Sequence, residues 1–131
     1  MSVERNLAVV AEHIENEARD PASVLHLYTE DVVQEFPARG LTVTGKEAIA
    51  ENYRKTFAAF EDVRLEPIDR FATENRVVDD MVVRFRLVGD TLPNAPVPVG
   101  SDVRLRLVHI FHMRDGLIAR EIVHENYQVL A

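Results

Sequence analysis

Apolar and polar positions alternate over the last quarter of the chain, between Val103 and Val129. In its first half the even positions mix arginine with valine and isoleucine, and the odd positions are Val103, Leu105, Leu107, His109, Phe111 and Met113. Side chains alternate between the two faces of a strand, so the pattern predicts a strand over 103–113 with its odd face buried. A second strand over 117–129 is predicted to follow Arg114-Asp115-Gly116, because Asp-Gly is a strong hairpin signal.

Three helices are predicted before these strands. Apolar residues at helical spacing predict an amphipathic helix over about residues 3–18. Asp20-Pro21 predicts the start of a short second helix, with Asp as N-cap and Pro at the first helical position. Thr44-Gly45-Lys46-Glu47 fits a capping box and predicts a third helix. One side of that helix carries Ile49, Tyr53, Phe57 and Phe60.

Shorter alternating patterns predict the remaining strands. Residues 31–36 are a strand candidate that ends at the turn Pro37-Ala38-Arg39-Gly40. A period of two begins at Val63, and its predicted apolar face holds Val63, Leu65, Asp69 and Phe71. After a turn at 73–75, a strand over 76–88 is predicted to point Val77, Asp79, Met81, Val83, Phe85 and Leu87 inward.

The segment from Gly89 to Gly100 contains three prolines and is predicted to be a loop. A loop of this length in a small domain often forms a lid or rim. We expect it to border the entrance of a pocket and to be mobile.

Helices followed mainly by long antiparallel strands indicate an α+β fold. We expect a cone-shaped, curved antiparallel β-sheet wrapped around the N-terminal helices, with an internal pocket open at one end. The 131 residues, 47% of them hydrophobic, suit a single domain over 1–131.

Charge and composition narrow the function. The net charge of −7 argues against nucleic acid, whose binding needs a clustered basic surface. The absence of cysteine excludes disulfides and thiolate sites. No apolar run is long enough to predict a membrane span, and the N-terminal residues do not have the pattern of a signal peptide. We therefore expect a soluble cytoplasmic protein. The sequence contains no motif that resembles a glycine-rich phosphate loop, so no cofactor is predicted. The five histidines lack metal-ligand spacing, so no metal is predicted.

His109 is the one polar residue on the apolar face of its strand. Two interpretations stay open: a core histidine with a hydrogen-bond partner, or an imidazole held for chemistry. If the following turn uses three residues with a bulge at Gly116, His109 lies across from Glu121. If the turn uses two residues, His109 faces Ile122 and His124.

Other candidate groups are carboxylates on apolar faces and polar residues on helices. Asp69 and Asp79 are either proton acceptors or carboxylates at strand ends in water. His13 and Glu17 lie four apart on the first helix and can reach each other. Tyr53 is the aromatic residue of the third helix whose polar tip can point into a cavity.

Three segments in this order carry a family resemblance: residues 20–33, Thr44-Gly45-Lys46-Glu47-Ala48-Ile49 and Met113-Arg114-Asp115-Gly116-Leu117-Ile118. Together they resemble the nuclear transport factor 2-like superfamily over nearly the whole chain. The similarity is greatest to the branch of ketosteroid isomerases, limonene epoxide hydrolases and SnoaL-like polyketide cyclases. The resemblance implies the cone-shaped fold, which hosts several chemistries as well as proteins without catalysis.

The functional residues of these related enzymes are only partly matched at the corresponding positions of this chain. Phe36 stands where ketosteroid isomerases have their general-base aspartate, and Glu12 or His13 where they have an oxyanion tyrosine. His109 stands where they hold a protonated aspartate, so the resemblance implies a hydrogen-bond donor there. Gln34, Phe36 and Val123 replace the polar residues of epoxide hydrolases. The resemblance also favours the hairpin in which His109 and Glu121 share a face.

We therefore expect a cofactor-independent enzyme that performs isomerisation, dehydration or cyclisation on a mainly apolar carbonyl or polycyclic compound. The alternatives are a non-catalytic ligand-binding or assembly domain and a hydrolase of epoxide-like substrates. The predicted catalytic residues are His109, Glu121, Glu17 and Asp79. The predicted substrate-binding residues are His13, Gln34, Phe36, Tyr53, Phe57, Met81, Val83, Leu107 and Val123.

The outward face of the sheet predicts an assembly. It places Val82, Val88, Val108 and Ile110 among Arg84, Arg86, Arg104 and Arg106. Such a mixed face is typical of a polar-rimmed interface, so we expect a homodimer formed through the outer sheet face.

Overall fold

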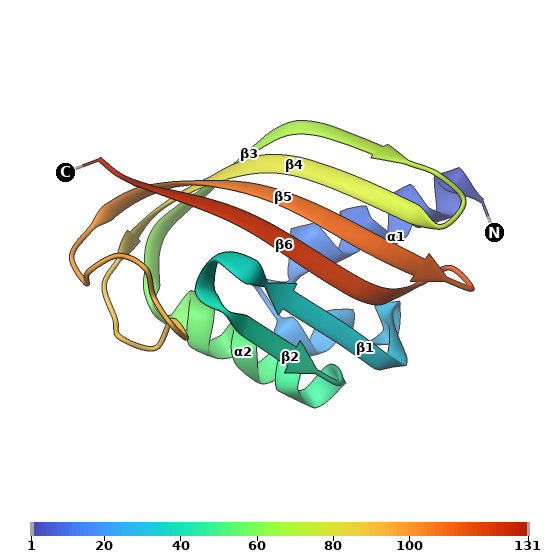
Figure 1. Ribbon diagram of the computed structural model, residues 1–131, viewed down its shortest axis with the longest axis horizontal. Coiled ribbons are helices and arrows are strands. Elements are labelled where there is room, and N and C mark those ends of the chain that lie inside the picture. The colour runs from blue at the N-terminus through green and yellow to red at the C-terminus, as the bar shows by residue number, and fades with distance from the viewer. Residues whose placement is uncertain (1, 131) are drawn as a thin grey trace.

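One curved sheet of six strands arches over the helices (Figure 1). The structure is a computed structural model, which describes residues 2–130. The helices are α1 (Val3–Asn16), the 3₁₀ helices η1 (Pro21–Leu27) and η2 (Pro37–Arg39), and α2 (Lys46–Ala58). The strands are β1 (Tyr28–Phe36), β2 (Leu41–Thr44), β3 (Phe60–Ala72), β4 (Arg76–Leu87), β5 (Asp102–Arg114) and β6 (Leu117–Val129). Both α-helices lie on the same side of the sheet, which leaves the opposite face uncovered (Figure 1).

The strand order is β2-β1-β6-β5-β4-β3, and every neighbouring pair is antiparallel except β1–β6. The predicted α+β fold with a curved sheet around N-terminal helices is confirmed, with a mixed rather than wholly antiparallel sheet. The parallel pair arises because α2 carries the chain from β2 at one edge to β3 at the other. Successive hairpins then return the chain until β6 meets β1.

The β5–β6 hairpin combines the two alternatives left open by the sequence. Its turn has two residues, Asp115 and Gly116, both at positive φ, and Arg114 pairs with Leu117. A bulge at Ala119 then shifts the register, since Met113 pairs with Ile118 but His112 pairs with Arg120. The bulge was predicted at Gly116 and lies three residues later.

The bulge determines which side chains of β6 enter the interior. Beyond it, odd positions of β5 and β6 share the concave face, as expected from the three-residue alternative. His109 lies directly opposite Val123, and Glu121 lies opposite Phe111. The predicted direct pairing of His109 with Glu121 is therefore wrong by one step along the face, and the two side chains meet diagonally.

The inward faces of β4 and β5 agree with the predicted alternation. Their inward residues are buried apart from Leu107, which is half-buried. Helix α1 packs against this face, so the apolar core lies between α1, α2 and the concave sheet. Among residues 2–130, no helix is both long and apolar enough to cross a membrane.

Three local predictions are wrong for identifiable reasons. Thr44 ends β2, a strand that the sequence pattern missed, so α2 begins after Gly45 without a capping side chain. Phe60 was assigned to the helix and instead begins β3. The predicted inward face of β3 is largely exposed, because β3 is an edge strand that α1 covers only in part. On that face Val63, Leu65 and Phe71 are exposed, and Ile68 is exposed on the opposite face predicted for β3.

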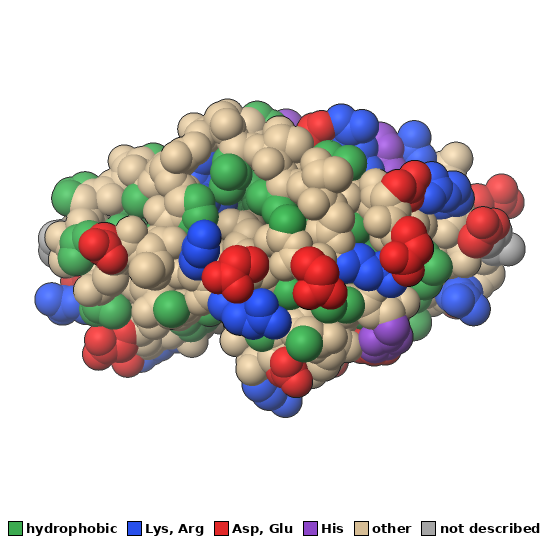
Figure 2. All heavy atoms as spheres, turned by 90° about the horizontal axis from the view of Figure 1, so that it is seen from below, with side chains coloured by type: hydrophobic (Ala, Val, Ile, Leu, Met, Phe, Trp, Pro, Cys, Tyr) green, Lys and Arg blue, Asp and Glu red, His purple; other side chains and the backbone are tan. Residues whose placement is uncertain are grey.

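The loop between β4 and β5 contributes the buried Leu92 to the pocket lining. That residues 89–100 border the pocket entrance stays a prediction, as does their mobility. Figure 2 shows acidic and basic side chains interspersed with apolar ones on the face that carries α2 and β2.

Candidate active site

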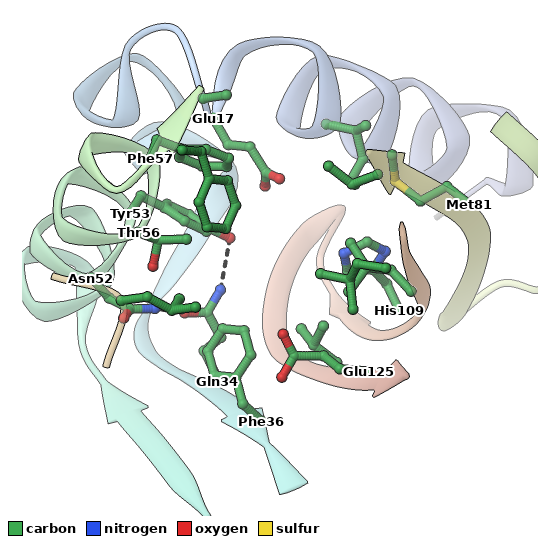
Figure 3. Close-up of a pocket in the computed structure, with 18 of the residues that line it drawn as sticks. Glu17, Gln34, Phe36, Asn52, Tyr53, Thr56, Phe57, Met81, His109 and Glu125 are labelled. Carbon is green, nitrogen blue, oxygen red and sulfur yellow. Dashed lines mark hydrogen bonds between the residues drawn. The ribbon is translucent and has the colours of Figure 1, made fainter. Parts of the chain in front are cut away.

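A pocket opens between the two α-helices and the concave face of the sheet (Figure 3). Most of its wall is apolar, with side chains contributed by both helices and by β1, β4, β5 and β6. The apolar lining includes Phe36, Phe57, Met81, Val83, Leu105, Leu107 and Val123. Such a wall fits the hydrocarbon part of a small ligand.

Polar side chains from five elements converge on this pocket. Glu17 follows directly after α1, Gln34 comes from β1, Tyr53 from α2, His109 from β5 and Glu121 from β6. Alternation along the strands turns Gln34, His109 and Glu121 inward. In Figure 3, the Glu17 carboxylate and the His109 ring point into the cavity from opposite sides.

Three of these groups form a buried hydrogen-bond network. Gln34 Nε2 donates to Tyr53 OH at 2.7 Å and to Glu121 Oε1 at 3.0 Å. Tyr53 OH in turn donates to Glu121 Oε1 at 3.3 Å. Asn52 Nδ2 holds the other end of the amide by donating to Gln34 Oε1 at 3.4 Å. The network fixes the Glu121 carboxylate as an acceptor.

His13 lies behind this network, rather than in the pocket wall. Its Nε2 is 2.6 Å from Tyr28 OH and 3.1 Å from Tyr53 OH. Burial lowers the pKa of His13 to about 4, so the ring is neutral near pH 7. His13 was predicted to bind substrate; its place behind Tyr53 makes it a support for that hydroxyl instead.

His109 has a carboxylate near each ring nitrogen. Nδ1 is 3.3 Å from Asp79 Oδ2, at ion-pair distance but without the alignment of a full hydrogen bond, and Nε2 is 3.9 Å from Glu121 Oε2. Burial lowers the pKa of His109, but the neighbouring Asp79 and Glu121 outweigh it and raise the pKa above its ordinary value.

Asp79 lies behind His109, outside the main pocket. Arg70 Nε donates to Asp79 Oδ1 at 2.8 Å. Burial favours the neutral acid, yet the interactions with His109 and Arg70 prevail and lower the pKa of Asp79. Asp79 is therefore ionised near pH 7 and stabilises the imidazolium form of His109.

Glu17 has the opposite electrostatic environment. Its side chain is only 15% exposed, and its Oε2 lies 3.1 Å from Nδ1 of the neutral His13. Burial, together with the negative charge of Glu121, raises the pKa of Glu17 to about 8. A carboxyl group whose pKa lies near neutral pH can both take up and release a proton.

A second polar cluster lines another part of the same pocket. Arg39 Nε donates to Glu125 Oε1 at 2.9 Å, and both side chains are nearly fully buried. Tyr127 OH donates to Glu125 Oε2 at 2.8 Å. The Arg39 guanidinium also stacks over the Phe36 ring, 4.5 Å from its centroid.

The structure brings together nearly all the predicted site residues. Every predicted substrate-binding residue except His13 lines the pocket, as do three of the four predicted catalytic residues, the exception being Asp79. Sequence reasoning missed Arg39, Thr56 and Asn52, and did not use Glu125 or Tyr127. For Glu125 and Tyr127 the signal was available, since they continue the odd, inward positions of β6. Asp69, an alternative candidate base, is exposed outside the main pocket.

No group of three or more His, Cys, Asp or Glu side chains within residues 2–130 is arranged to hold a metal ion. The acid and base groups instead occur in pairs and in a hydrogen-bonded network around an apolar space.

The sequence model of the SnoaL-like domain matches residues 7–121. The chain belongs to the SnoaL-like domain family. The matched range runs from α1 into β6 and includes Glu17, His109 and Glu121, whereas Glu125 and Tyr127 lie beyond it. No curated protein sequence matches this SnoaL-like chain significantly.

Solved structures share this fold. A candidate SnoaL-like polyketide cyclase from Jannaschia aligns with a TM-score of 0.79 at 17% identity, covering 95% of this chain and 87% of that one. A nuclear transport factor 2-like protein from Burkholderia pseudomallei aligns at 0.75 and 22% identity, covering 96% and 92%. A ketosteroid isomerase-like protein from Catenulispora acidiphila, in complex with trimethylamine, aligns at 0.70 and 20% identity, covering 88% and 82%. At these identities the likeness concerns the fold alone.

Proposed function

We propose that this SnoaL-like protein is a cofactor-independent enzyme that moves a proton next to a carbonyl group. The reaction would be an isomerisation, dehydration or cyclisation of a mainly apolar carbonyl or polycyclic compound. The observation that carries the proposal is the placement of Glu17 and His109 on opposite sides of one apolar pocket (Figure 3).

His109 is the group proposed to bind the carbonyl oxygen. Asp79 and Glu121 favour its imidazolium form, which can donate a hydrogen bond from Nε2. Removal of a proton next to a carbonyl places negative charge on the oxygen, and a donor aimed there stabilises the enolate. The apolar wall strengthens this interaction by excluding water.

Glu17 is the proposed base, because its rivals are engaged or misplaced. Asp79 is paired with Arg70 and His109, and its pKa is lowered. Glu121 accepts hydrogen bonds from Gln34 and Tyr53. Glu17 Oε2 lies 3.1 Å from His13 Nδ1 without the alignment of a hydrogen bond, and the Glu17 carboxylate faces the cavity. Its raised pKa makes the ionised form a stronger base than an ordinary carboxylate.

The experiment that tests the proposal follows deuterium incorporation next to the carbonyl of ketones in D₂O. A set of aryl ketones, steroid ketones and polyketide-like diketones is incubated with the protein, and exchange is measured by mass spectrometry. We expect catalysed exchange for at least one ketone that binds. Saturable binding without catalysed exchange for every ketone would contradict the proposal and favour a non-catalytic binding domain.

A further inference from the structure

The Arg39–Glu125–Tyr127 cluster lies in the pocket wall but takes no part in the proposed proton transfer. Its ion pair is nearly free of solvent, with 2% of the Arg39 side chain and 4% of the Glu125 side chain exposed. Removing both charges from water costs several kcal/mol per ion, and a buried pair often contributes little net stability. An ion pair kept at a pocket wall is therefore better explained by ligand recognition than by stability.

The hydrogen bonds of the Glu125 carboxylate leave room for one more. It accepts from Arg39 Nε at 2.9 Å, from Arg39 Nη2 at 3.4 Å and from Tyr127 OH at 2.8 Å. A carboxylate offers about four lone-pair sites. In Figure 3, its oxygens point into the cavity.

The cluster is firmly held in place. Arg39 Nη1 donates to the backbone oxygen of Pro93 at 2.7 Å, and Asn94 Nδ2 donates to the backbone oxygen of Arg39 at 3.0 Å. These bonds join η2 to the loop between β4 and β5. Because the guanidinium is fixed by the loop and by Phe36, the carboxylate that it binds is pre-organised for a ligand.

The spacing along strand β6 gives the distance between the polar region at His109 and the cluster that contains Glu125. His109 lies opposite Val123, and Glu125 is the next inward residue. Two residues along a strand span about 7 Å, which separates the level of His109 from that of Glu125. Between these levels the wall is apolar, with Leu105, Leu107 and Val123. The spacing fits a ligand with two oxygens separated by a fused pair of rings.

We propose that Glu125, held by Arg39, is the recognition site for a hydroxyl group at the far end of the substrate. The ligand class is thus an apolar carbonyl compound of bicyclic length or longer that carries a hydroxyl donor opposite its carbonyl. This inference rests on the proposed function for the orientation of the carbonyl, but its test uses equilibrium binding alone.

The test compares three fluorescent probes of one shape: 2-acetylnaphthalene, its 6-hydroxy derivative and its 6-methoxy derivative. Only the hydroxy probe can donate to Glu125. A hydrogen bond to a charged group contributes about 1.5–3 kcal/mol, which corresponds to a roughly 10- to 100-fold lower Kd. We expect the parent protein to bind the hydroxy probe at least about 10-fold more tightly than the methoxy probe.

Two variants test whether the preference for the hydroxy probe depends on Glu125. Arg39→Met combined with Glu125→Leu removes both charges without leaving either one buried alone, and is expected to reduce the hydroxy preference to less than threefold. Tyr127→Phe frees an acceptor site on Glu125 and is expected to keep or increase it. The exposed pair Arg84–Glu66, replaced as Arg84→Met with Glu66→Leu, is the matched control and should leave the preference unchanged.

The outcomes separate this inference from the proposed function. Equal Kd values of the parent for the three probes, or no binding of any probe below about 1 mM (about −4 kcal/mol), would overturn the assigned ligand class. Neither result depends on catalysed deuterium exchange. A preference that survives in the double variant would place the hydroxyl elsewhere and also overturn the inference.

Discussion

Asp79 and His109 face each other across the β4–β5 pair, with 3.3 Å between Asp79 Oδ2 and His109 Nδ1 and with both side chains almost fully buried. Arg70 holds the other carboxylate oxygen of Asp79. The proposed active site therefore has a layer of charge behind His109, which favours a donor on the pocket side of the ring.

Asp79 is a positioning residue for His109, and Asp79→Asn is expected to lower the pKa of the His109 ring. The physical reason is that burial then acts with less opposing negative charge. NMR titration of the imidazole signals measures this pKa without any substrate. Where a substrate is known, we expect kcat to fall roughly 10- to 100-fold with a smaller change in KM.

The control for this change is Asp80→Asn, which lies on the same strand and pairs with Arg106 on the outer face. It should leave the His109 titration as it is in the parent. An unchanged His109 pKa in Asp79→Asn would show that Asp79 does not determine the charge of the ring.

Replacing Glu17 is expected to stabilise the fold at alkaline pH. Its pKa is raised from 4.5 to about 8 in the folded protein, so between these pH values the folded state binds more protons than the unfolded state. The free energy of unfolding of the parent should therefore fall as the pH rises through this window. In Glu17→Gln, the part of this fall in the free energy of unfolding that Glu17 causes is absent.

Urea unfolding at pH 6.5 and pH 8.5 measures this change in the free energy of unfolding. Both pH values lie above the range in which His13 titrates. We expect the stability advantage of Glu17→Gln over the parent to grow by about 1 kcal/mol or more between these pH values, because one pKa unit corresponds to about 1.4 kcal/mol. Glu12→Gln on the exposed side of α1 is the control. A constant difference between Glu17→Gln and the parent would mean that Glu17 is ionised throughout.

The uncovered face of the sheet leads to a prediction of assembly. Val108 and Ile110 are half-buried there, and Asp80 neutralises Arg106 through bonds of 2.6 Å. We expect a homodimer through this face, since charge pairing within the chain leaves an apolar centre with a polar rim. Light scattering across the micromolar range should give twice the chain mass; a monomer mass independent of concentration would contradict the prediction.

The sequence predicted the central strands of the sheet better than the strands at its edges. Alternation determines which face of β4 and β5 is buried, so His109 could be recognised as a polar residue in an apolar row. At β3 the same alternation failed, because an edge strand with incomplete helix cover does not bury either face. The short strand β2 lacks enough residues to show any period.

Pairings between distant segments were harder to predict. Asp79 and His109 were both candidates, but their contact depends on the register of β4 against β5, which a long loop sets. Arg39 sits in a turn with no local signal, and reaches Glu125 only because β1 runs parallel to β6. The position of Glu121 depends on the bulge at Ala119, which no glycine marks.

The most direct test of the proposed mechanism is the exchange rate of a responsive ketone with His109→Leu and His109→Asn, beside His112→Leu on the outer face of the same strand. Losing one donor to a developing oxyanion costs roughly 100- to 1,000-fold in rate. We predict a loss of that size in His109→Leu, a smaller loss in His109→Asn, whose amide can still donate, and an unchanged rate in His112→Leu. If His109→Leu folds normally and keeps its rate within about threefold of the parent, far less than the loss of an oxyanion donor, His109 is a core histidine and the proposed mechanism is wrong.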